Sequence, residues 1–139
     1  MGTSQKILVV DDDRDYVAGI RYVLEAKQYE VVAAYDAEEG LLKARDAHPD
    51  IILLDIMMGK GAEGILFARK VRHDPEYGAC AGIPILVLTS MREKTGFWFT
   101  NEPKHPVFFP IDEIVEKPVK PADLLEKIRR MLAADKTPT

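Results

Sequence analysis

Short apolar runs alternate with amphipathic segments along most of the chain, and this alternation limits the fold more than any other feature. A continuous apolar run of roughly four to eight residues is typical of a strand that is covered on both faces. Such runs predict strands over residues 7–10, 30–34, 51–54 and 83–88, and the short segment 113–116 is expected to form a fifth strand. Apolar residues at helical spacing predict helices over residues 14–27, 37–47, 62–73 and 121–133. Strands that alternate with helices predict βαβ units, a parallel sheet and a doubly wound α/β fold.

Three of the predicted helices begin with a local start signal. Asp13 is predicted to cap the first helix. Asp36 followed three residues later by Glu39 has the pattern of a capping box for the second helix. Pro121 is expected to open the last helix, where its missing N–H group removes no helical hydrogen bond.

One stretch interrupts this alternation. A helix is due between Thr89 and Lys117, but the sequence there has no helical period and contains Pro103, Pro106 and Pro110. Prolines this dense exclude a regular helix, so we expect the fourth helix to be replaced by an irregular loop over residues 96–111. Its aromatic residues are expected either to pack over the edge of the sheet or to form a partner surface: Phe97, Trp98, Phe99, Phe108 and Phe109.

The composition fits one globular domain of 139 residues, since 47% of the residues are hydrophobic and 30% are charged. The net charge of −4 gives no global sign of nucleic-acid binding. The apolar runs are well short of the roughly 20 residues that a membrane helix needs. The short polar beginning does not have the pattern of a signal peptide, and the lone Cys80 suits a reducing compartment. These features predict a soluble, cytoplasmic protein.

Polar residues follow the predicted strands at their carboxyl ends. Asp11 and Asp12 follow the first strand, Asp55 follows the third, Thr89 the fourth and Lys117 the fifth. In an open parallel sheet, the carboxyl ends of the strands form the ligand crevice. If the first and third strands are neighbours, Asp11, Asp12 and Asp55 meet in that crevice.

Carboxylates that lie this close repel one another and resist full ionisation, and a hard divalent cation removes the conflict. Mg²⁺ prefers oxygen ligands, and the lack of His and Cys in the cluster argues against zinc. An ionised aspartate can attack phosphorus. Lys117 can supply a cation and Thr89 a hydroxyl donor for the negative charge that spreads over the transferring group. The residues therefore predict magnesium-dependent phosphoryl chemistry.

Four segments stand at the ends of the predicted strands: KILVVDDD at residues 6–13, IILLDIMM at 51–58, LVLTS at 86–90 and EKP at 116–118. They are similar to the signature segments of response-regulator receiver domains and occur in the order found in that family. The resemblance implies a flavodoxin-like sheet of five parallel strands in the order 2-1-3-4-5. It also implies one receiver domain over residues 4–134, with short tails at 1–3 and 135–139.

The resemblance further implies a role for each carboxylate. Asp55 would be the phosphoacceptor. Asp12 and Asp55 would hold Mg²⁺ directly, together with the backbone carbonyl of Met57, and Asp11 would act through water.

Two other residues take roles toward the phosphoryl group by the same resemblance. Thr89 would bind the group and shift on activation. Lys117, positioned by a cis peptide bond to Pro118, would pair with the phosphoryl oxygens.

The partners that the resemblance implies are a histidine kinase or phosphotransfer protein, which supplies the phosphoryl group, and a downstream protein that receives the signal. The last residues, 135–139, are too few for an output domain, so we expect a stand-alone receiver that does not bind nucleic acid directly. Such a domain is a signalling module that assists its own phosphorylation and dephosphorylation rather than an enzyme.

The sequence departs from the family pattern at several positions. Family members commonly have proline where this chain has Gly59, and the Glu63-Gly64 pair comes one residue late. Ile114 stands three residues before Lys117, at the position of the aromatic switch residue. The existence of a coupled switch between Thr89 and an aromatic side chain is therefore open.

Three other functions remain as alternatives. A small haloacid-dehalogenase-like phosphatase would use Asp11 as its nucleophile, but it would leave Asp55 without a role. An electron carrier that binds flavin mononucleotide would need a phosphate-binding loop after the first strand, where this chain has three carboxylates. The third alternative is a receiver-like docking module that is never phosphorylated.

Overall fold

The structure is a computed structural model, and it describes residues 5–56, 63–89 and 112–135. Five strands form one parallel sheet with the order β2-β1-β3-β4-β5. Their bounds are β1 Lys6–Val10, β2 Glu30–Ala34, β3 Ile51–Leu54, β4 Ile85–Thr89 and β5 Glu113–Glu116. The helices are α1 Arg14–Ala26, α2 Ala37–Ala47, α3 Glu63–His73, the 3₁₀ helix η1 Pro75–Cys80 and α5 Pro121–Asp135. The doubly wound sheet and its strand order confirm the expected fold.

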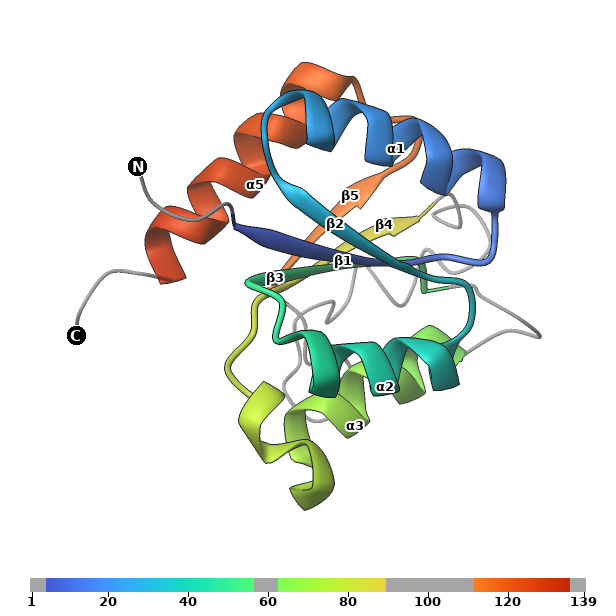
Figure 1. The fold of residues 1–139 in the computed structure, drawn as a ribbon, viewed down its shortest axis with the longest axis vertical. Coiled ribbons are helices and arrows are strands. Elements are labelled where there is room, and N and C mark those ends of the chain that lie inside the picture. Colours follow the sequence, from blue (N-terminus) through green and yellow to red (C-terminus); the bar gives the residue numbers. More distant parts are fainter. Residues whose placement is uncertain (1–4, 57–62, 90–111, 136–139) are drawn as a thin grey trace.

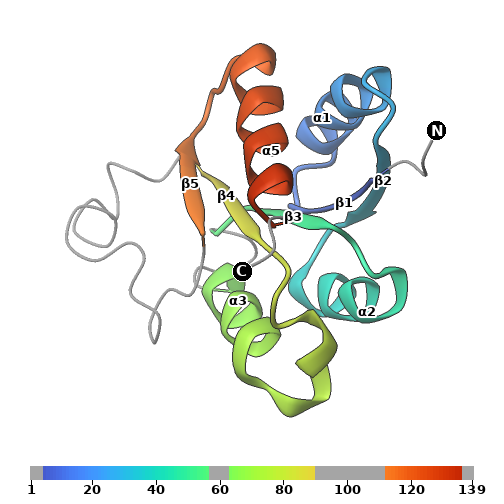
Figure 2. The ribbon, with the colours of Figure 1, turned by 90° about the vertical axis from the view of Figure 1, so that its left-hand side faces the viewer.

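The helices form a layer on each face of the sheet. Helices α1 and α5 cover one face, and α2 and α3 cover the other, as Figures 1 and 2 show from two directions. Successive residues of a strand point to opposite faces, so each strand contributes to two cores. In β1, Ile7 and Val9 pack with α1 and α5, whereas Leu8 and Val10 pack with α2 and α3. Burial on both faces explains why β1, β3 and β4 are apolar along most of their length.

The predicted helix starts are present. Asp13 caps α1, and its Oδ1 accepts a hydrogen bond from the Tyr16 backbone N–H at 3.1 Å. Asp36 caps α2 and accepts from the Glu39 N–H at 2.7 Å. The Glu39 carboxylate reaches back to the N–H of Tyr35 at 2.9 Å, one residue before the cap. These bonds satisfy N–H groups that have no partner inside the helix.

Several boundaries differ from the sequence-based expectation. Strand β4 begins at Ile85 rather than residue 83, with Pro84 before it, and it extends to Thr89. Helix α3 begins at Glu63, one residue later than expected, and α5 continues two residues further, to Asp135. The 3₁₀ helix η1, which follows α3, is not among the helices expected from the sequence. The expected irregular loop over residues 96–111 lies outside the described residues.

Among the described residues, no helix combines the length and the apolar character that crossing a membrane requires.

A single arginine joins α3 to the beginnings of β4 and β5. The Arg72 guanidinium donates to the carbonyl oxygens of Ala81 and Ile83 at 3.1 and 2.6 Å, and to Asp112 Oδ2 at 2.6 Å. The same Asp112 oxygen accepts from the Ile85 N–H at 2.8 Å. The Arg72 side chain is 15% exposed and its bonds to the two carbonyl oxygens are partly buried, whereas the Asp112 side chain is 47% exposed.

We predict that Arg72→Met lowers the free energy of unfolding by about 2–3 kcal/mol, because it removes bonds to a charged group and leaves half-buried carbonyl oxygens without a donor. Urea denaturation measures the change. Arg69→Met is the matched control on the exposed side of the same helix, and it should stay within about 0.5 kcal/mol of the wild type. Equal unfolding midpoints for the two variants would contradict the role of Arg72.

Candidate functional site

Three carboxylates meet where β1 and β3 end. The two strands are parallel neighbours with Val10 opposite Leu54, so the residues that follow them emerge side by side. The backbone pairing continues past both strands, since the Asp55 N–H donates to Val10 O at 3.0 Å and the Asp11 N–H donates to Ala34 O at 3.1 Å. The carboxyl-bearing residues are therefore held by the sheet itself.

Oxygen atoms of Asp11, Asp12 and Asp55 all lie within 4.8 Å of one another. The three side chains differ in exposure: Asp11 is only 2% exposed, Asp55 is half-buried and Asp12 is exposed. Asp11 Oδ1 accepts a hydrogen bond from the Asp13 N–H at 2.9 Å. A set of oxygen ligands that runs from the interior to the surface suits a hard divalent cation that enters from solvent.

Lys117 follows β5, which is separated from β3 by β4 in the sheet, and its side chain reaches the acidic cluster at the ends of β1 and β3. Its Nζ atom lies 2.9 Å from Asp11 Oδ2 and 3.8 Å from Asp55 Oδ2. The side chain is 15% exposed, and the bond from Lys117 to Pro118 is cis, as expected from the resemblance. The ammonium group compensates the nearly buried charge of Asp11, which would otherwise be costly to desolvate.

The structure thus brings Asp11, Asp12, Asp55 and Lys117 together, although their separate roles stay predictions. Thr89 is the last residue of β4, two strands away from β1 in the sheet, and its side chain lies outside the described part of the chain. Met57, whose carbonyl was expected to help bind Mg²⁺, also lies outside it.

Tyr16 is a site residue that the sequence analysis did not single out. Its ring lies under the Lys117 ammonium, with Nζ 4.0 Å from the ring centroid. Its hydroxyl is buried and has no hydrogen-bond partner among the described residues. Burial raises the pKa of Tyr16 to about 12, and the carboxylates of Asp11, Asp55 and Asp13 add to the rise, so the hydroxyl is neutral at physiological pH.

Gly64 fixes the approach of α3 to the residues that follow β3. A Cβ atom at this position would lie 2.5 Å from Ile56 Cα, 2.7 Å from Asp55 O and 2.8 Å from Ile56 O. All three atoms belong to the backbone, so no side chain can rotate away. The sequence indicated this glycine only as a displaced part of a family pattern.

We predict that Gly64→Ala lowers the free energy of unfolding by about 1–3 kcal/mol, because the added methyl group overlaps backbone atoms and forces α3 away from residues 55 and 56. Gly19→Ala in α1 is the control, since a Cβ there meets nothing within 4 Å. That substitution should raise stability by up to about 1 kcal/mol through helix propensity. Urea denaturation compares the variants, and a stability gain in both would show that α3 is free to shift.

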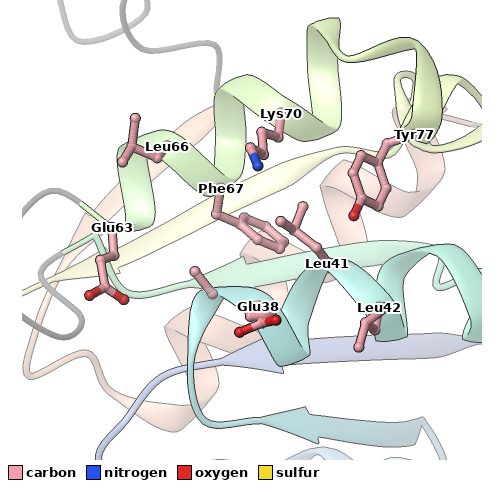
Figure 3. Close-up of a pocket in the computed structure, with 9 residues that line it drawn as sticks. Glu38, Leu41, Leu42, Glu63, Leu66, Phe67, Lys70 and Tyr77 are labelled. Atoms are coloured by element: carbon pink, nitrogen blue, oxygen red, sulfur yellow. The ribbon is translucent and has the colours of Figure 1, made fainter.

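A second concave region lies between α2 and α3, apart from the acidic cluster. Leu41, Leu42, Leu66 and Phe67 contribute apolar surface, and Glu38, Glu63 and Lys70 lie around them (Figure 3). Leu42 and Leu66 are 45% and 56% exposed. None of the carboxylates of the acidic cluster lines this groove.

The fold and the acidic cluster together define the receiver class, and comparison with known proteins agrees. The response regulator receiver domain family matches residues 7–129. The chain therefore belongs to the response regulator receiver domain family, which consists of signalling domains of two-component systems.

The chain is similar to the alkaline phosphatase synthesis transcriptional regulatory protein PhoP of Bacillus subtilis, with 33% identity over 93% of this chain and 49% of that protein. It is also similar to a solved CheY-like receiver domain protein from Methanospirillum hungatei, with 29% identity, a TM-score of 0.76, and 96% and 98% of the two chains covered. A receiver domain of a sensor histidine kinase from Pseudomonas aeruginosa has the same fold at 21% identity and a TM-score of 0.76, covering 94% of this chain and 99% of that one; it holds a magnesium ion in its active-site cleft. The chain spans about half the length of the curated relatives it matches.

Proposed function

We propose that Asp55 is the phosphoacceptor of this receiver domain and that it takes a phosphoryl group from the phosphohistidine of a histidine kinase or phosphotransfer protein. The observation that carries the proposal is the position of the Asp55 carboxylate, half-buried beside Asp11 and Asp12, with the Lys117 ammonium 3.8 Å from its Oδ2 atom. This arrangement favours Asp55 over Asp11 as the nucleophile, because Asp11 is almost fully buried and is paired with Lys117 at 2.9 Å.

The proposed reaction forms one bond and breaks one bond at phosphorus. A carboxylate oxygen of Asp55 attacks the phosphorus atom, and the bond from phosphorus to the donor histidine nitrogen breaks, leaving that nitrogen as part of a neutral imidazole after proton uptake. Negative charge spreads over the oxygens of the transferring group. Lys117 stands where it can pair with those oxygens, and Thr89, at the end of β4, is proposed to supply a hydroxyl donor.

Mg²⁺ is the proposed cofactor, and the donor set fits it. The cluster offers three carboxylates and no nitrogen or sulfur ligand, as a hard cation prefers. Asp12 and Asp55 would hold the ion directly, Asp11 would act through water, and the Met57 carbonyl is included on the family resemblance. When bound, the ion supplies positive charge for the phosphoryl oxygens.

The proposed partners are proteins. A kinase or phosphotransfer protein supplies the phosphoryl group, and a downstream protein receives the signal from the phosphorylated domain, which we place at residues 4–134. We propose a cytoplasmic location, which the lone, buried Cys80 supports because a thiol of this kind needs no oxidising compartment.

The first functional test is phosphorylation by a small donor. Acetyl phosphate with Mg²⁺ should label the wild-type protein, and Asp55→Asn should reduce the label to background, because an amide cannot form the acyl phosphate. Intact-mass measurement and hydroxylamine sensitivity identify the product. Asp46→Asn, an exposed substitution on α2, is the matched control and should label like the wild type. Full labelling of the Asp55 variant would place the phosphoacceptor elsewhere.

The second functional test concerns the metal. We predict that Asp12→Asn weakens Mg²⁺ binding by at least roughly tenfold, since even the loss of a group that supports a ligand has an effect of that size. Isothermal titration calorimetry measures the affinity without phosphorylation, and Asp46→Asn again serves as the control. If Asp12→Asn binds Mg²⁺ as tightly as the wild type, Asp12 is not a ligand.

A further inference from the structure

Of the contacts that the Lys117 ammonium makes with described residues, the one with the Tyr16 ring does not involve a charged partner. The other two are with Asp11 at 2.9 Å and Asp55 at 3.8 Å. The ring centroid of Tyr16 lies 4.0 Å from Nζ, well within the distance at which the face of an aromatic ring attracts a cation. The ring packs against the core between the sheet and helices α1 and α5, and this packing holds the ring in position.

The difference between these contacts matters when the site becomes occupied. Asp11 and Asp55 belong to the carboxylate cluster, so a bound cation or an attached phosphoryl group changes their charge or their partners. The attraction between the ring and the ammonium depends on the quadrupole of the ring, which neither event alters. Occupation of the site therefore leaves the basis of the Tyr16 contact unchanged, whereas it acts directly on the contacts with the carboxylates.

We propose that Tyr16 is a positioning residue that holds the Lys117 ammonium over the face of its ring, beside the phosphoacceptor, while the carboxylates of the cluster are engaged. The effect on phosphorylation rests on the proposed function of Asp55, whereas the placement of Lys117 does not. Tyr16 acts through Lys117 and does not touch the transferring group in this proposal.

The Tyr16 hydroxyl has no part in this role. It is buried and donates to no acceptor among the described residues. Tyr16→Phe keeps the aromatic face and removes the hydroxyl, whereas Tyr16→Leu removes the face. The two substitutions therefore distinguish attraction by the ring from the competing explanation, in which the Tyr16 hydroxyl donates a hydrogen bond to the phosphoryl group.

The first experiment measures the position of Lys117 directly by NMR, without any phosphoryl donor. Protons above the face of an aromatic ring are shifted upfield, so the ε-methylene signal of Lys117, assigned by comparison with Lys117→Arg, should be upfield of the other lysines. The shift should remain in Tyr16→Phe, disappear in Tyr16→Leu, and remain after Mg²⁺ is added to the wild type. An unshifted Lys117 signal in the wild type, or loss of the shift on adding Mg²⁺, would overturn the proposal.

The second experiment measures the rate of phosphorylation by acetyl phosphate with Mg²⁺. Tyr16→Leu should lower the rate by roughly 2- to 30-fold, the range that corresponds to a cation–π contact. Tyr16→Phe should restore most of the rate. Tyr22→Leu removes the same kind of side chain from the exposed face of α1, where Tyr22 is 79% exposed, and should leave the rate unchanged. A rate for Tyr16→Phe as low as that for Tyr16→Leu would assign the effect to the hydroxyl and overturn the proposal.

A double-mutant cycle shows whether Tyr16 acts through the lysine. In a Lys117→Met background, Tyr16→Leu should change the rate by less than about twofold, because no cation remains for the ring to hold. An undiminished effect of Tyr16→Leu in that background would show that Tyr16 acts independently of Lys117.

Replacement of Tyr16 by pentafluorophenylalanine covers the case in which Tyr16→Leu does not fold. This side chain keeps the shape of phenylalanine but reverses the quadrupole of the ring, so the rate should fall relative to Tyr16→Phe. Equal rates for the two rings would refute ring attraction. Failure of the wild-type protein to accept phosphate would instead reject the proposed function and leave the NMR result on Lys117 standing.

Discussion

The pairing of the nearly buried Asp11 carboxylate with the Lys117 ammonium is the interaction on which the site depends. An ionised carboxylate that is 2% exposed requires charge compensation, and Lys117 supplies it at 2.9 Å from 106 residues along the chain. The pair fixes the carboxyl end of β1 relative to the end of β5, although β3 and β4 lie between these strands. Asp55 stands at the end of β3, between β1 and β5 in the sheet. It therefore has the carboxylates that follow β1 on one side and the Lys117 ammonium on the other.

The sheet can impose this arrangement because both of its faces are buried. Alternate residues of each strand enter separate cores under α1 and α5 or under α2 and α3, so a shift of one residue would exchange the two sets. Backbone pairing continues from β1 and β3 into Asp11 and Asp55 themselves. The site carboxylates are therefore held with the rigidity of the sheet, and the close approach that Gly64 allows fixes the helix that begins beside them.

The sequence predicts those parts of the structure that depend on local patterns. Strands β1, β2 and β3 lie within one residue of the predicted positions because their apolar runs are directly visible, and the meeting of Asp11, Asp12 and Asp55 follows from their places after neighbouring strands. Contacts that depend on packing between distant segments were not predictable. Arg72 bonds to Asp112, which lies 40 residues further along the chain. Tyr16 meets Lys117 because the fold brings the first turn of α1 next to the residue that follows β5. At helical spacing, Tyr16 is indistinguishable from an ordinary core residue, and only the folded chain shows a cation over its ring.

The formal charges at the site indicate how much negative charge the cations around Asp55 have to balance. Among the described residues, three carboxylates face one ammonium group, which leaves two formal negative charges for a divalent cation to balance. In the proposed reaction a phosphoryl group would add charge at Asp55, and the cation beside that carboxylate is the Lys117 ammonium, 3.8 Å from its Oδ2 atom. A lysine bound only to carboxylates would have to exchange one strong ion pair for another, with a desolvation cost at each step. By the role proposed for Tyr16, a ring that attracts the ammonium without carrying charge would lower that cost, because one contact of Lys117 would stay in place while its pairing moved from Asp11 toward the phosphoryl oxygens.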